Sequence, residues 1–267
     1  KSVINNELFK DDLFVQKEFN NSNYIFVNFK NMSTPSDCEN IGSKLYDYLK
    51  KNKLENSCIE TNKIDLSQDQ LERIVHGAKL KSYNFNIYKF DKNKNKNIIL
   101  NIIGKKINKS NKLRKNLDAL LDGVFFTRDL VSEPGNILHP DEYAKRLNSL
   151  RKYGLKVTVY DEKKLKKLGM NTLLGVGQGS IRGSYLVTME WSGLNKKTKP
   201  LAFVGKGVCF DTGGISLKPA KFMEDMTYDM AGSAVVVGLM KNLALRKSKV
   251  NAVGVVGLVE NMPGGNA

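Results

Sequence analysis

Two aspartates and two lysines gather around a glycine pair in the C-terminal part of the chain. Lys206, Asp211 and Lys218 share one short stretch with Gly213-Gly214, and Asp229 follows soon after it. Glycines permit a tight turn and a close approach of the backbone to a ligand. Charged side chains are costly near a core unless they are paired or bind something. The cluster therefore predicts an oxygen-rich ligand site.

The position of the cluster supports this prediction. The apolar run 200–204 predicts a strand, and Asp211 follows the extension of that strand. Open α/β sheets bind ligands at the C-terminal ends of their strands. We therefore expect Asp211 to lie at a strand end where a ligand can reach it.

Each residue alone also has a simpler interpretation. Asp229 could be the N-cap of a helix that begins near Met230. Lys206 and Lys218 could be solvated side chains in a chain rich in lysine. Only the combination of all four residues in one segment favours the ligand site.

Other signatures of function are incomplete. Residues 175–180 resemble a dinucleotide-binding loop but lack its last glycine, and we predict a turn there. Gly205-Lys206-Gly207 lacks the flanking residues of a phosphate-binding loop. The two histidines, His76 and His139, give few candidates for a histidine-rich zinc site or a catalytic triad. We predict that His76 lies on a helix face and that His139 lies in a loop.

Three blocks in the same order resemble one enzyme family. The blocks are VGKGVCFDTGGISLKP at 204–219, MTYDMAGSA at 226–234 and VENMPGGNA at 259–267, with weaker similarity at 77–85, 128–136 and 168–170. Together they are similar to the leucyl aminopeptidases, the dinuclear-metal cytosol aminopeptidase family. The resemblance covers about 77–267, and the residues before it match little.

The resemblance implies a set of roles for the four residues. Lys206, Asp211 and Asp229 match metal ligands, with Asp211 bridging two divalent ions, and Lys218 matches the catalytic lysine. Carboxylates suit such ions, which lower the pKa of water so that it can attack a peptide carbonyl. The Lys218 ammonium would stabilise the oxyanion that results. Mn or Zn is the expected metal, with Mg or Co as alternatives, and peptides with a free N-terminus are the expected substrates.

The chain departs from the family pattern at its end. The resemblance implies further ligands from an Asp-x-Glu pair, and an Arg after it, beyond the 259–267 block, whereas the sequence ends at Ala267. We therefore expect a fragment that is inactive or nearly so by itself. The complete protein is expected to be a homo-hexamer.

The elements that must position these residues follow an α/β pattern. Residues 1–110 predict an N-terminal α/β domain, 111–136 a connecting helix and loop, and 137–267 the first part of an α/β/α sandwich catalytic domain. Alternating strands and helices favour a largely parallel sheet with helices on both sides. Apolar periodicity and breakers predict strands at 24–29, 97–103, 156–160, 185–190, 200–204 and 251–259, and helices at 37–51, 67–82, 113–131, 141–153, 162–168 and 230–246.

Composition limits the class of protein. No apolar run is long enough to span a bilayer, and the start lacks the apolar stretch of a signal peptide. Three cysteines without a CxxC spacing favour a reducing cytoplasm. The formal net charge of +16 would suit a nucleic-acid partner, so a non-catalytic basic protein with the same fold is the alternative function. Lysine and asparagine are abundant throughout, including the predicted solvated loop 91–97, and aromatics do not alternate with the basic residues as a stacking surface requires. We therefore favour the enzyme.

Overall fold

A computed structural model describes residues 13–19, 22–28, 32–61, 66–90, 98–104, 111–195 and 197–265. The predicted loop 91–97 lies outside these ranges. The chain divides into two compact units, 1–114 and 115–267. Within the described ranges, no helix combines the length and the apolar composition that a transmembrane segment requires.

The first unit contains two small sheets and a helix pair. Strands β1 and β2 form an antiparallel hairpin, and β3 pairs with β4 in parallel. Helices α1 and α2 each begin with a capping box, at Thr34 and Ser67, which satisfies the free backbone N–H groups of the first turn. The bounds are β1 Phe14–Phe19, β2 Ser22–Val27, α1 Pro35–Lys51, β3 Asn56–Glu60, α2 Gln68–Lys81 and β4 Ile99–Ile103.

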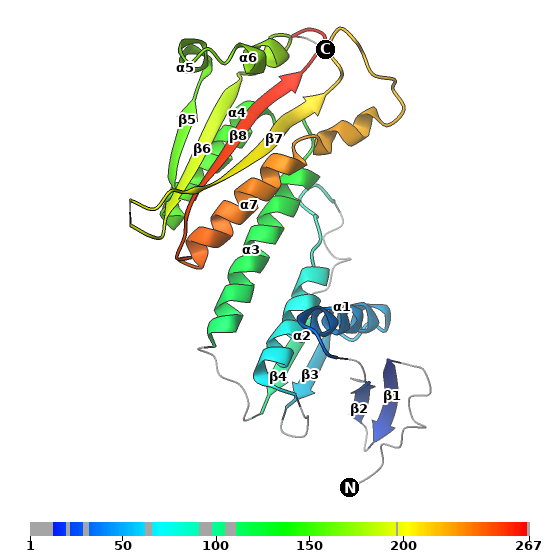
Figure 1. Cartoon of the computed structure of the whole chain (residues 1–267). Coiled ribbons are helices and arrows are strands. Elements are labelled where there is room, and N and C mark those ends of the chain that lie inside the picture. The colour runs from blue at the N-terminus through cyan, green and yellow to red at the C-terminus, as the bar shows by residue number, and fades with distance from the viewer. Residues whose placement is uncertain are drawn as a thin grey trace. The chain divides into compact units, whose positions relative to one another are not determined.

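The second unit is a four-stranded sheet with helices on both faces. Its strand order is β5-β6-β8-β7 (Figure 1). The bounds are α3 Lys112–Ser132, α4 Pro140–Asn148, β5 Lys156–Tyr160, α5 Glu162–Lys167, α6 Asn171–Gly177, β6 Tyr185–Ser192, β7 Leu201–Asp211, α7 Ala231–Leu245 and β8 Asn251–Asn261, with 3₁₀ helices at Ser149–Tyr153 and Met223–Tyr228. The helices and strands expected from the sequence are present, whereas β1, β3 and α6 were not predicted.

The core of this unit lies between the sheet and three helices, α3, α4 and α7. Leu130, Tyr143, Val237 and Val256 are among its fully buried side chains. Helix α6 covers the other face. A Cβ atom added to Gly257 of β8 would lie 3.1 Å from the side chain of Leu173 of α6, so the two elements are in close contact. The arrangement confirms the predicted α/β/α layers.

The prediction of a largely parallel sheet is wrong in its pairings. Only β7 and β8 pair in parallel, whereas β6 is antiparallel to both β5 and β8. Between β6 and β7 the described residues 193–195 and 197–200 form no helix, and β7 runs opposite to β6. Parallel neighbours need a longer crossover, and between β7 and β8 the helix α7 provides it.

One local prediction is wrong in part. Residues 175–177 form the end of α6, and the predicted turn occupies only 178–180. His139 lies in the loop before α4, as predicted, and is the N-cap residue of that helix, where its side chain accepts a hydrogen bond from the backbone N–H of Glu142. Pro140 then occupies the first helical position, where its missing N–H costs nothing. His76 lies on α2, as predicted, and is buried.

Candidate metal centre

Strand β7 carries Lys206 and ends at Asp211, as the sequence predicts. Its parallel register with β8 is regular from Leu201 to Val208 and then shifts, so that Asp211 pairs with Asn261. Such an irregularity re-aims a side chain and is frequent next to active sites. The shift places the Asp211 carboxylate at the strand end, beside the turn that follows.

The turn after β7 brings Lys218 back to Asp211. Gly213 and Gly214 have φ angles of +90° and +66°, which residues with a side chain rarely adopt. The backbone N–H of Lys218 donates to the carbonyl of Thr212 at 2.9 Å and closes the turn. As a result, Lys218 Nζ lies 2.6 Å from Asp211 Oδ2. The catalytic lysine and the bridging ligand of the prediction are therefore in direct contact.

The second predicted pair is equally close. Lys206 Nζ lies 2.5 Å from Asp229 Oδ1, although 60% of the Lys206 side chain is exposed. Asp229 follows the 3₁₀ helix Met223–Tyr228 and does not cap α7, whose N-cap residue is Met230 and has no side-chain cap. The simpler interpretation of Asp229 as the N-cap of the following helix is therefore wrong.

The contacts of Asp211 favour its ionised form. Burial alone would raise the pKa of the Asp211 carboxyl, but the hydrogen bonds from Lys218, Gly213 and Asn261 outweigh it and lower that pKa below its usual value. Lys218 Nζ also lies 3.1 Å from Met226 Sδ. No hydrogen bond or ion pair joins the two Lys–Asp pairs directly within the described part of the chain.

The residues fit a divalent cation through their oxygens. Asp229 Oδ2 is buried and has no hydrogen-bond partner among the described residues, and such an orphaned carboxylate oxygen is normally paired or bound to a metal. The described residues hold no group of three or more His, Cys, Asp or Glu side chains that could bind a metal ion. The donor set here is thus two carboxylates and one lysine amine.

Gly205 allows the two halves of the second pair to meet. A Cβ atom at this position would lie 2.6 Å from Ser233 Cα and 2.7 Å from the Gly232 carbonyl oxygen, both in the first turn of α7. Ser233 is fixed in turn by Tyr143, whose hydroxyl lies 2.9 Å from Ser233 Oγ. The absent side chain therefore lets α7 approach β7, and Asp229 meets Lys206.

Gly205→Ala is expected to destabilise the protein by about 1–3 kcal/mol, because the added methyl group must push backbone atoms apart. Urea unfolding measures this change. Gly175→Ala is the matched control, since a Cβ there meets nothing within 4 Å and alanine suits a helix better than glycine does. Equal stability of the two variants would show that β7 and α7 can accommodate a methyl group at Gly205.

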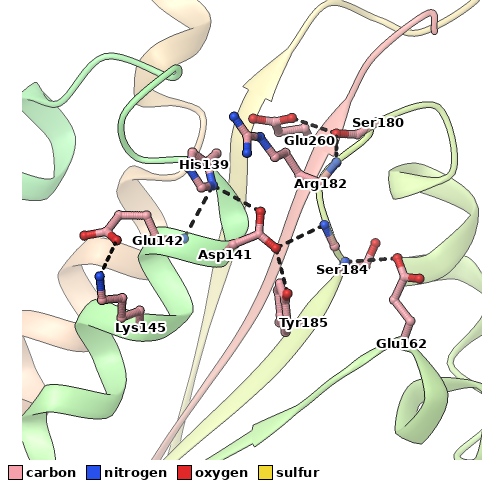
Figure 2. Close-up of polar contacts among 11 residues, drawn as sticks. His139, Asp141, Glu142, Lys145, Glu162, Ser180, Arg182, Ser184, Tyr185 and Glu260 are labelled. Atoms are coloured by element: carbon pink, nitrogen blue, oxygen red, sulfur yellow. Dashed lines mark hydrogen bonds and ion pairs between the residues drawn. The ribbon is translucent and has the colours of Figure 1, made fainter. Parts of the chain in front are cut away.

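A second polar cluster fixes the neighbouring strand ends (Figure 2). Asp141 accepts hydrogen bonds from the Tyr185 hydroxyl at 2.7 Å and from the Gly183 N–H at 3.3 Å, and lies 3.1 Å from His139 Nδ1. Burial, followed by the hydrogen bond to Asp141, raises the pKa of Tyr185 to about 12. These contacts tie the start of α4 to the start of β6.

The same region holds the end of β8 in place. Ser180 Oγ donates to Glu260 Oε2 at 2.7 Å. Glu260 immediately precedes Asn261, the last residue of β8. A cavity of about 290 Å³ is lined by Phe210, Arg182 and Glu260, among others, and by none of the four predicted site residues.

Comparison with known proteins identifies the family. A family model described as the catalytic domain of the cytosol aminopeptidase family matches residues 125–267, more than half of the chain. The chain belongs to the cytosol aminopeptidase family. This confirms the resemblance found in the sequence, and the matched range includes all four predicted site residues.

Individual cytosol aminopeptidases agree with this assignment. A probable cytosol aminopeptidase of Caulobacter vibrioides is 51% identical over 209 residues, which cover 77% of this chain and 42% of that protein. A structure of a tomato leucine aminopeptidase mutant has a TM-score of 0.77 at 26% identity, covering 93% of this chain and 50% of that one. The bottromycin maturation enzyme BotP in complex with Mn shares the fold, with a TM-score of 0.78 at 24% identity over 95% of this chain and 55% of its own. The chain thus spans about two fifths of the length of its curated relative.

Sequence reasoning named the four charged residues but missed their neighbours. It gave no role to Asn261, which donates to Asp211 Oδ1 at 2.7 Å, or to Thr212, which anchors the turn. Asn261 lies inside the block that resembles the family, and its pairing with Asp211 becomes visible only once the register of β7 and β8 is known.

Proposed function

We propose that the protein is a metal-dependent aminopeptidase that removes N-terminal amino acids, with leucine-like residues preferred. The observation that carries this proposal is the pairing of two aspartates with two lysines beside the end of β7, in a member of the cytosol aminopeptidase family. Asp229 has a carboxylate oxygen without a hydrogen-bond partner among the described residues. The Asp211 carboxylate contacts the Lys218 ammonium.

Each residue has a distinct task in this proposal. Asp211 and Asp229 would hold the divalent ions through carboxylate oxygens, with Asp211 shared between two ions and Lys206 as an amine donor. When bound, such ions supply a water of lowered pKa and polarise the peptide carbonyl. The Lys218 ammonium contacts Asp211, and the backbone N–H of Lys218 donates to the Thr212 carbonyl. Held in this way, the ammonium would stabilise negative charge on the carbonyl oxygen of the scissile bond.

The donor set indicates which metals the site would bind. Carboxylate and amine donors suit Mn or Zn best, with Mg or Co as alternatives. The structural relative BotP is described in complex with Mn. We propose two ions per subunit, peptides with a free N-terminus as substrates, a homo-hexamer for the complete protein and a cytoplasmic location. None of the three cysteines forms a disulfide. A non-catalytic protein that binds nucleic acid through its positive charge remains the alternative function.

The 267-residue chain by itself is proposed to be inactive or nearly so. Two divalent ions need at least four ligands each, including water, and the donors found here are Lys206, Asp211 and Asp229. This set would leave one of the ions with Asp211 as its sole protein ligand.

The test is hydrolysis of leucine p-nitroanilide by a protein that extends this chain to the length of its relatives. Turnover should disappear with a chelator, return with Mn²⁺ or Zn²⁺, and be absent with the N-acetylated substrate. Turnover that ignores the chelator, or equal cleavage of the acetylated substrate, would contradict the proposal. Turnover by the 267-residue chain that Lys218→Ala abolishes would contradict the expectation that this chain alone is inactive.

A further inference from the structure

Asn261 is the last residue of β8 and lies opposite Asp211 in the parallel register. Its side-chain Nδ2 donates a hydrogen bond of 2.7 Å to Asp211 Oδ1. Its backbone carbonyl accepts two more, from the Thr212 N–H at 2.9 Å and from Thr212 Oγ1 at 2.8 Å. A single residue of β8 therefore holds both the carboxylate at the end of β7 and the first residue of the turn.

The contact with the side-chain amide fixes the rotation of the Asp211 carboxylate. Oδ1 accepts from Asn261 Nδ2 and from the Gly213 N–H at 2.9 Å, whereas Oδ2 faces the Lys218 ammonium. An ionised carboxylate only accepts hydrogen bonds, so two N–H donors on Oδ1 turn Oδ2 toward a cation, here the Lys218 ammonium. Without Nδ2, the Gly213 N–H is the one donor that remains on Oδ1, and the Lys218 ammonium remains on Oδ2.

The backbone contact extends this control to Lys218. The Thr212 carbonyl accepts from the Lys218 N–H, so the anchoring of Thr212 by Asn261 also places the lysine. The side chain fits closely against the turn, since a Cβ on Gly214 would lie 2.7 Å from Asn261 Oδ1. The glycine at this position gives the amide room to reach Asp211.

We propose that Asn261 is a positioning residue for metal binding, whose side-chain amide orients the Asp211 carboxylate toward the cation. The inference rests on the proposed function, because it takes Asp211 as a metal ligand. When a residue that hydrogen-bonds to a metal ligand and orients it is replaced, metal affinity typically falls by roughly 10–100-fold. Asn261 has the contacts expected of such a residue.

The experiment is a calorimetric titration of the 267-residue chain with Mn²⁺, in wild type and three variants. Asn261→Ala and Asn261→Leu both remove the N–H donor, and leucine keeps the γ-branched shape of asparagine should the alanine variant fold poorly. Both are expected to weaken Mn²⁺ binding by roughly 10–100-fold. Thr212→Val is the matched control, because it removes the hydrogen bonds of the Thr212 hydroxyl, to the Asn261 carbonyl and from the Gly214 N–H, without removing the donor to Asp211.

The comparison separates orientation from simple anchoring. Thermal unfolding in the presence of a chelator reports the stability of each variant, and the control should lose stability while it keeps most of its Mn²⁺ affinity. Wild-type affinity in both Asn261 variants, or an equal loss in Thr212→Val, would overturn the positioning role and leave the proposed function in place. Failure of the wild-type chain to bind Mn²⁺ would overturn the positioning role, whereas hydrolysis by the longer protein tests the proposed function separately.

Discussion

Replacing Lys218 by alanine is expected to lower kcat of the proposed aminopeptidase reaction by roughly 10²- to 10³-fold, the usual effect of removing one group that stabilises an oxyanion. Lys218 Nζ lies 2.6 Å from Asp211 Oδ2, so the ammonium is held next to the proposed ligand of the metal ions. The backbone of Lys218 is fixed by Thr212, and this limits the reorganisation that the reaction would require. Steady-state hydrolysis of leucine p-nitroanilide by a protein of the relatives' length measures the change.

The lysine substitution should leave the metal ions bound. Removing the ammonium takes a positive charge away from Asp211, and this favours a cation at the carboxylate. Lys221→Ala is the matched control, because Lys221 is exposed and contacts the Phe222 ring. If Lys218→Ala lost its metal together with its activity, or if Lys221→Ala were equally impaired, Lys218 would have a structural role and not the proposed catalytic one.

Asp211→Asn is expected to remove metal binding and activity together. The substitution keeps the shape of the side chain but removes the charge that a divalent cation and the Lys218 ammonium both need. Asp211 is the proposed ligand of both ions, so no other single substitution should affect the donor set as much. Mn²⁺ titration and the hydrolysis assay measure the two losses independently.

A neighbouring aspartate provides the control for this charge change. Asp225 lies in the 3₁₀ helix just before Asp229 and is only partly buried. Asp225→Asn removes the same charge from the same region and should retain Mn²⁺ affinity. Comparable losses in the two variants would point to a general field effect and would argue against coordination by Asp211.

The four site residues could be named from the sequence because they lie in short blocks of consecutive residues that resemble one family. An apolar run followed by Asp211 predicts a strand end, and the glycines after it predict a tight turn. Both features depend on a few consecutive residues. The structure shows the strand end and the turn, whereas the contact between Lys218 and Asp211 was not predicted.

Features that depend on strand pairing could not be predicted in the same way. The direction of β6 is set by which strands it pairs with, and alternation of strands and helices does not encode this. One signal was available in the sequence. No helix was expected between the predicted strands 185–190 and 200–204, which indicates that these strands run in opposite directions. The contact of Asn261 with Asp211 likewise requires the register of β7 and β8, including its shift after Val208.

The role of Asp229 shows how one residue changes an interpretation. An aspartate before a helix is usually an N-cap, and the sequence left this alternative open. In the structure α7 begins at Ala231, so Asp229 stands too early to cap it. Its carboxylate instead meets Lys206, because the contact between Gly205 and Ser233 brings the two elements together.

Asp211, Asp229 and Lys206 are proposed to form one divalent metal site. The decisive measurement is anomalous diffraction from crystals of the 267-residue chain soaked in Mn²⁺, with Asp211→Asn crystals treated in the same way. A Mn²⁺ peak is expected within about 2.0–2.3 Å of carboxylate oxygens of Asp211 and Asp229 in the wild type, with no peak there in the variant. A peak at another place on the chain, or the same peak in both crystals, would rule out this site.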